Sequence, residues 1–235
     1  MKNSRVRELR AMDMTTLPSS GLRFTLNGET FDLRIPHPDD VNTLLEAIQE
    51  SLPELKRFML WAHFESTLDP EYQNKRIAAA REAYLAGADF VFHLWNGDQI
   101  VGGAGLHPRA LNPRALEVGY WIRSSYSGRG LATAVVKACA VFNFEHLKNQ
   151  RLQCLVNEAN HASLSVARKC GFRLEGELKY WEAQGTEEHR AQGFEVGVSG
   201  LMHGMTVDEL ERLSWYPDVV AKTELLPTVR TESLE

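Results

Sequence analysis

A short glycine turn, Ser127 to Gly130, connects an apolar run to a helix-like segment and constrains the fold more than any other feature. Residues 115–122 before it predict a strand, and the apolar residues after it recur at the helical spacing of three and four. Gly128 and Gly130 permit a tight turn whose N–H groups point toward the unpaired amides of the helix N-terminus. Such a turn suits a phosphate or pyrophosphate.

The turn alone is also compatible with a strand-to-helix connection that binds no ligand. It lacks the Gly-Lys-Ser/Thr end of a nucleotide-binding P-loop. Thr133 stands where a dinucleotide-binding turn has its third glycine. The wider sequence therefore has to decide between the two interpretations.

The rest of the chain alternates short strands with amphipathic helices. Two hairpins are predicted, at residues 22–35 around Asn27-Gly28 and at residues 89–106 around Asn96-Gly97. Helices are predicted at 41–48, 70–84, 131–142 and 161–170, and further strands at 152–156, 172–183 and 194–202. We expect an N-terminal arm at 1–20, one domain at 21–205, and a C-terminal part at 206–235 that holds a short helix to about Leu213 and a polar tail.

Composition excludes several classes of protein. The three cysteines among 235 residues have wide, unrelated spacings, and the eight histidines show no HxxxH pattern, so neither a disulfide framework nor a metal site is expected. A net charge of −5 disfavours binding to a nucleic-acid backbone. No apolar run reaches the roughly 18 residues of a membrane span, and the N-terminus has no signal-peptide core. These features favour a cytoplasmic protein without a nucleic-acid or membrane partner.

Four segments in order, EVGYWI, GRGLAT, NHAS and GFRLEG, resemble the GNAT N-acetyltransferases, and among them the RimJ/RimL type that acetylates protein N-termini. The resemblance covers residues 22–203. It implies an α/β fold of GNAT type, with a mixed and mainly antiparallel sheet and helices on both faces.

The resemblance also implies acetyl-CoA as co-substrate. It would bind where the strand at 115–122 diverges from the strand at 152–156. The pantetheine arm would pair with the backbone of Ile122 and Arg123. Main-chain amides would hold the pyrophosphate, and these belong to Gly128, Arg129, Gly130, Leu131, Ala132 and Thr133. Asn160 resembles the family asparagine that contacts CoA, and Ser163 resembles the serine beside the thioester sulfur. The alternative role of Asn160 is a helix N-cap, and that of Ser163 is a serine in the first turn of the helix without a ligand contact.

The chain departs from the family pattern at two positions. Ser125 replaces the glutamine or arginine usual before the loop, which puts that side-chain contact in doubt but leaves the amides. Ala167 stands where many GNAT enzymes carry the tyrosine that protonates the departing thiolate. RimJ/RimL-type relatives share this absence, so the resemblance assigns the acid role to Ser163.

The proton acceptor for the attacking amine is predicted to be a carboxylate, because only a neutral amine is nucleophilic. Glu182 is the one acid on an otherwise apolar strand face, and it matches the glutamate of the RimL pattern. Glu117, on the strand before the loop, is the competitor, with a cross-strand ion pair as its alternative role.

We therefore expect acetyl transfer to a primary amine, first of all a protein N-terminus of the ribosomal type. A small-molecule amine (an aminoglycoside, a polyamine or an aminoacyl-nucleotide) and a CoA-binding regulatory module without turnover are the alternatives. The sequence leaves a homodimer open.

Overall fold

The computed structural model describes the chain except for residues 1–19, 109–111, 180, 182–186, 193–198 and 228–235. The described strands form one mixed sheet in the order β7-β8-β6-β5-β4-β3-β2-β1-β9. Their bounds are β1 Gly21–Leu26, β2 Glu29–Arg34, β3 Phe90–Asn96, β4 Gln99–Pro108, β5 Ala115–Ile122, β6 Arg151–Asn157, β7 Arg173–Lys179, β8 Ser199–Thr206 and β9 Glu224–Leu225. Every neighbouring pair is antiparallel except β5 and β6, which are parallel. The predicted mixed, mainly antiparallel sheet is confirmed.

Local sequence accounts for the first hairpin. Asn27 and Gly28 connect β1 to β2 with φ angles of 52° and 83°, a pair of positive values that suits the right-handed twist of the strands. Phe24 and Phe31 face each other across this hairpin with ring centroids 5.7 Å apart. The hairpin therefore places both rings in the core, where they are buried.

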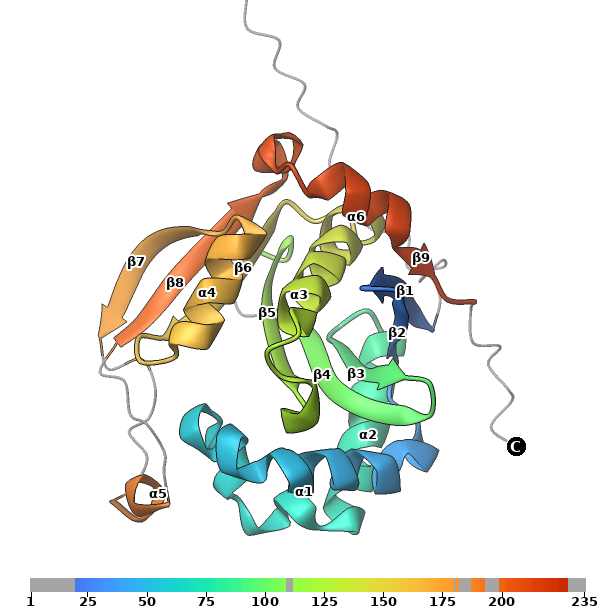
Figure 1. The fold of residues 1–235 in the computed structure, drawn as a ribbon, viewed down its shortest axis with the longest axis vertical. Helices are drawn as coiled ribbons and strands as arrows, with labels where there is room; N and C mark the ends of the chain where they lie inside the picture. The colour runs from blue at the N-terminus through green and yellow to red at the C-terminus, as the bar shows by residue number, and fades with distance from the viewer. Residues whose placement is uncertain (1–19, 109–111, 180, 182–186, 193–198, 228–235) are drawn as a thin grey trace, which may run out of the picture.

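Helices cover both faces of the sheet (Figure 1). Their bounds are α1 Val41–Phe58, α2 Pro70–Leu85, α3 Leu131–Val141, α4 His161–Cys170, α5 Glu187–Ala191 and α6 Tyr216–Lys222. In Figure 1, α3 and α4 lie in front of the sheet, and α1 crosses its lower end. None of the helices in the described parts of the chain combines the length and apolar character that crossing a bilayer requires.

Alternation along β4 serves two separate hydrophobic clusters. Ile100 packs in the cluster that contains Ile48 of α1 and Ile77 of α2. Its neighbour Val101 packs in the larger cluster with Val135 of α3. Because successive side chains of a strand point to opposite faces, β4 contributes to the hydrophobic clusters on both faces of the sheet.

The sheet opens at its centre. β5 and β6 pair only over the first part of β5, and the last paired residues are Glu117 and Gln153. Beyond this point β5 continues to Ile122 on the side of β4, while β6 continues to Asn157 on the side of β8. The strands diverge where the sequence resemblance predicts a cofactor site.

The C-terminal part differs from the predicted polar tail. The predicted short helix is present at Val207–Arg212 and begins with a capping box between Thr206 and Glu209, but it is 3₁₀ rather than α-helical. Two further elements follow, the helix α6 and the short strand β9, which pairs with β1. Residues 1–19 of the predicted arm lie outside the described residues.

Candidate active site

A cavity of about 480 Å³ lies at the divergence of β5 and β6. The loop after β5, the first turns of α3 and α4, and the end of α1 form its walls. Eight of the residues predicted to bind the cofactor line it: Ile122, Gly128, Gly130, Leu131, Ala132, Thr133, Asn160 and Ser163. The fold thus brings the glycine turn and the start of α3, as far as Thr133, together with Asn160 and Ser163 at the start of α4.

The glycine turn enters α3 with its amides open to this cavity. Gly128 and Gly130 have φ angles of 76° and 82°, and no atom of the described residues lies within 4 Å of where a Cβ would stand on either. Ala134 donates to the carbonyl of Gly130, so the amides before it remain outside the helical hydrogen-bond ladder. This open cradle of N–H groups fits a pyrophosphate.

Arg123 and Arg129 lie differently from the other predicted cofactor residues. Arg123 donates its N–H to Val101 and accepts from Tyr126 at its carbonyl, so its main chain is already engaged. By the alternation of an antiparallel strand, the main-chain groups of β5 that face the divergence belong to Ile122 and Tyr120. The side chain of Arg129 turns away to Glu29, at 2.7 Å.

The first turn of α4 carries the polar side chains. The Asn160 side chain accepts from the N–H of Ser163 at 3.0 Å and so caps the helix, as the alternative interpretation predicts. Asn160 also lines the cavity, so its cap and a cofactor contact are compatible. The hydroxyl of Ser163 lies 2.9 Å from that of Tyr120 on β5.

Tyr120 is a site residue that the sequence analysis did not single out. Burial raises the pKa of its hydroxyl well above the ordinary value, so the group stays protonated at neutral pH. The EVGYWI segment is the available signal, since Tyr120 and Ile122 share one face of the strand. Its partner Ser163 is 43 residues away in the chain.

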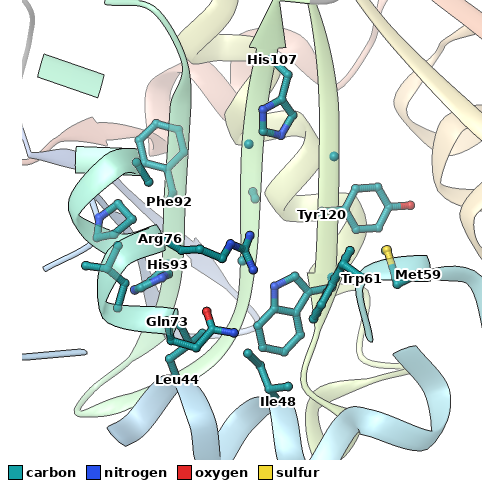
Figure 2. A pocket seen from close by; sticks show the side chains of 18 residues that line it. Leu44, Ile48, Met59, Trp61, Gln73, Arg76, Phe92, His93, His107 and Tyr120 are labelled. Carbon is teal, nitrogen blue, oxygen red and sulfur yellow. The ribbon is translucent and has the colours of Figure 1, made fainter. Parts of the chain in front are cut away.

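A second cavity, of about 250 Å³, lies on the face of the sheet that α1 and α2 cover. Met59, Tyr120 and Trp121 line both cavities, so the two meet at the end of β5. Figure 2 shows Arg76 reaching into the second cavity from α2, and His107 lying along the sheet. Its described lining contains no aspartate or glutamate.

Neither of the two carboxylates predicted as proton acceptors is found at the cavities in the described part of the chain. Glu182 lies outside the described residues. Glu117 accepts a hydrogen bond from Gln153 at 3.3 Å and lines neither cavity. In the part of the chain that the structure describes, no three His, Cys, Asp or Glu residues are arranged to hold a metal ion.

The three cysteines, Cys139, Cys154 and Cys170, are free and buried. Burial raises the pKa of each thiol to about 12. They remain protonated at neutral pH and therefore contribute packing rather than a nucleophile.

Sequence comparison identifies the family that this geometry suggests. The family model of the acetyltransferase (GNAT) domain matches residues 31–173, more than half of the chain. The chain belongs to the GNAT acetyltransferase family. As a member, it is an N-acetyltransferase that uses acetyl-CoA, and the predicted fold and enzyme class are confirmed.

Two of the curated relatives carry names of ribosomal acetyltransferases. This GNAT protein is 24% identical to the ribosomal-protein-serine acetyltransferase of Escherichia coli, over 66% of its own length and 85% of the relative. It is 26% identical to YdaF of Bacillus subtilis, whose name proposes a ribosomal N-acetyltransferase, over 64% and 82% of the two chains. A shorter match, 36% identical over 59 residues, links it to a third of the spermidine N(1)-acetyltransferase of Escherichia coli.

Solved structures share the fold at low sequence identity. RimJ of Mycobacterium smegmatis, determined with a CoA-disulfide, superposes with a TM-score of 0.73 at 19% identity, over 88% of this chain and 97% of that one. The ribosomal-protein-S5-alanine acetyltransferase of Vibrio fischeri gives a TM-score of 0.68 at 18% identity, over 80% and 97%. At 18–19% sequence identity, these structural similarities show a shared fold and nothing more specific.

Proposed function

We propose that this enzyme transfers acetyl from acetyl-CoA to the α-amino group of a protein N-terminus, as on a ribosomal protein. The observation that carries the proposal is the pair of cavities that approach the end of β5 and meet at Tyr120 and Trp121. The larger cavity would take acetyl-CoA and the smaller one the amine, so that both reactants reach one point in a fixed orientation.

For acetyl-CoA, the amides from Gly128 to Thr133 would hold the pyrophosphate. Ile122 would pair with the pantetheine arm through its free main-chain groups, whereas Arg123 has none to offer. Lys169 lines the same cavity, and its ammonium group has no partner among the described residues. It supplies a positive charge suited to a CoA phosphate.

Bound acetyl-CoA supplies the acetyl thioester. The N–H groups of β5 that face the divergence would donate to its carbonyl oxygen, which draws electrons from the carbon under attack. Ser163 and Tyr120, joined by their hydroxyls, would donate to the sulfur as it departs. The proton then comes from Ser163, which the resemblance assigns as acid, and Tyr120 supports its hydroxyl.

The charge of the smaller cavity favours a peptide over a polyamine. The guanidinium of Arg76 faces the cavity with no partner among the described residues, and the described lining has no carboxylate (Figure 2). A guanidinium donates to peptide carbonyls but repels the second ammonium group of a polyamine. Arg76 would therefore select an acceptor with one amine and several carbonyls.

A small-molecule amine is the second candidate, supported by the short match to a spermidine acetyltransferase. The absence of the family tyrosine at Ala167 supports a third, a CoA-binding module without turnover. These three functions predict different products from the same assay.

The test is thiol release from acetyl-CoA with three sets of acceptors: N-terminal peptides of ribosomal proteins, polyamines and aminoglycosides. Intact-mass analysis locates the acetyl group. We expect turnover with at least one peptide, and Arg76→Ala should raise KM for that peptide while improving use of spermidine. Turnover with polyamines alone would support the second candidate, and binding of acetyl-CoA without turnover the third.

A further inference from the structure

The cavity proposed for the acceptor amine holds a histidine that an aspartate orients. His107, on β4, has its Nδ1 2.7 Å from Oδ1 of Asp89, the residue just before β3. Its side chain is 24% exposed, and the imidazole lines the cavity. The carboxylate accepts from Nδ1–H, which leaves Nε2 of the neutral ring with a free lone pair.

Glycines on the sheet make room for this ring. A Cβ on Gly105 would lie 2.3 Å from Nε2 of His107, and one on Gly119 would lie 3.8 Å from it. Gly105 and Gly119 are cross-strand partners on β4 and β5. The imidazole therefore lies flat over β4 and β5, with Nε2 beside the residue that precedes Tyr120.

A second histidine, His93, faces the same cavity but has a different setting. Its Nδ1 lies 2.8 Å from Oδ2 of Asp40, which also accepts from the N–H of His37 and is the residue just before α1. His93 is on β3, two strands away from the divergence, and its side chain is only 8% exposed. His93 thus joins α1 to the sheet, whereas His107 lies one strand from the meeting point of the cavities.

Four charged or titratable groups lie on the elements around His107. Asp89 stabilises the imidazolium form directly, and Glu117, its cross-strand partner on β5, favours the same form. Arg76 of α2 and His93 of β3 line the same cavity and oppose a second positive charge.

We propose that His107, oriented by Asp89, accepts the proton that the acceptor amine must lose. This inference rests on the proposed function and gives His107 the role that the sequence predicts for Glu182 or Glu117. It adds a residue from the strand next to β5 that none of the four family segments contains.

The proton balance is complete with the groups present. The ammonium passes one proton to Nε2, and its nitrogen attacks the thioester carbon with the freed electron pair. The carbon–sulfur bond breaks, and its electron pair leaves with sulfur, which takes a proton from the hydroxyl of Ser163. The second proton of the nitrogen restores that hydroxyl, and His107 later releases its proton to water.

The test is the pH profile of kcat/KM for wild type and His107→Gln. In wild type the rate should rise through the ionisation of His107 and then level off. In His107→Gln it should fall by about 10²-fold or more near pH 7, and the defect should shrink about tenfold for each pH unit, because the neutral amine becomes more abundant. The affinity for acetyl-CoA should stay within about twofold, since His107 lies outside that cavity.

Asp89→Asn tests the orientation by the carboxylate. Without that negative charge the imidazole loses its proton more easily, so the acid limb of the profile should move to lower pH. The matched control is His37→Gln, which removes an exposed histidine beside Asp39 outside both cavities. Its profile should match wild type.

An NMR titration of the imidazole, without acceptor, separates this proposal from the proposed function. The signal absent from His107→Gln should titrate over the same pH range as the acid limb of kcat/KM in wild type and shift in Asp89→Asn. A ring that stays protonated above about pH 9 overturns the proposal, even if wild type acetylates peptides. The proposal is also overturned if the kcat/KM profile loses its acid limb in Glu182→Gln or Glu117→Gln and keeps it in His107→Gln. Wild type that acetylates no amine overturns both proposals.

Discussion

The conformation of Gly128, more than the space around it, makes this residue necessary in the phosphate turn. Its φ of 76° is one that side-chain-bearing residues rarely adopt, and a side chain there would project into open space at the cavity. We predict that Gly128→Val weakens acetyl-CoA binding at least about tenfold by calorimetry, through backbone strain and obstruction of the amides.

Two controls separate these effects. Gly97→Val introduces the same kind of strain at a φ of 60° in the turn between β3 and β4, and it should leave acetyl-CoA affinity near that of wild type. Arg129→Ala should also bind nearly normally, because the guanidinium is engaged by Glu29. Equal affinity in Gly128→Val and wild type would show that the pyrophosphate binds elsewhere.

The hydroxyl pair of Ser163 and Tyr120 gives a second prediction at the residue scale. Ser163→Ala should lower kcat by roughly tenfold or more, while the Kd for acetyl-CoA stays nearly constant, the pattern of an interaction made in the transition state. Tyr120→Phe should produce a similar loss. Because the two hydroxyls are 2.9 Å apart, the double variant should lose less than the product of the two single effects.

This loss should not depend on pH between 6 and 9, since burial raises the pKa of Tyr120 far above that range. Steady-state kinetics over this range measures it. Unchanged turnover in Ser163→Ala would indicate that water protonates the thiolate.

At the scale of elements, α1 holds the segment between β5 and the glycine turn. The Glu50 carboxylate accepts from the N–H of Ser125 at 3.0 Å and from Arg123 at 2.6 Å, and Ser51 of the same helix accepts from Ser124. The pKa of Glu50 is lowered, first by the hydrogen bond from Ser125 and then by Arg123, which outweigh its partial burial. The carboxylate therefore stays ionised at mildly acidic pH.

We predict that Glu50→Gln raises the Kd for acetyl-CoA by about fivefold, the equivalent of roughly 1 kcal/mol, because the segment before the glycine turn loosens. Its cost in unfolding free energy should be below about 1 kcal/mol, since the Glu50 side chain is 34% exposed. Calorimetry and urea unfolding measure the two effects. Glu46→Gln, an exposed residue one turn earlier, is the control and should leave both values unchanged.

The pH dependence of this contribution has a definite sign. A carboxyl whose folded pKa is lowered stabilises the folded state above its unfolded pKa of about 4.3, and this stabilisation is lost as pH falls through the folded value. The difference in unfolding free energy between wild type and Glu50→Gln should thus be constant from pH 5 to 7 and shrink near pH 3. A difference that grows on acidification would contradict the assigned interaction.

At the scale of the whole molecule, Trp215 and the helix α6 pack against one side of the hydrophobic core. Tyr216 is buried and donates to Glu145 at 2.7 Å, and Trp215 donates to the carbonyl of Cys170. We predict that Tyr216→Ala lowers the unfolding free energy by about 3 kcal/mol and the Tm by roughly 6–12 °C. Val220→Ala, at a 36% exposed position of the same helix, should change Tm little. Thermal unfolding distinguishes this packed end from a loose tail, for which both variants would resemble wild type.

Local interactions explain what the sequence by itself determined. The Asn27-Gly28 turn, the Asp69 and Asn160 helix caps and the glycine turn before α3 each depend on contacts within a few residues, and all are present. Together with the resemblance of the EVGYWI, GRGLAT, NHAS and GFRLEG segments to the GNAT family, they were sufficient to predict the fold and eight of the residues that line the larger cavity.

The remaining features depend on contacts between distant segments. α6 has seven residues and is too short to be stable alone, so its packing on the core, rather than its own periodicity, makes it a helix. Tyr120 meets Ser163 only because β5 and β6 diverge after Glu117, and His107 meets Asp89 only because β3 and β4 lie side by side. The sequence pattern alone could not predict these pairs, because the strand register and the sheet opening decide which side chains face each other.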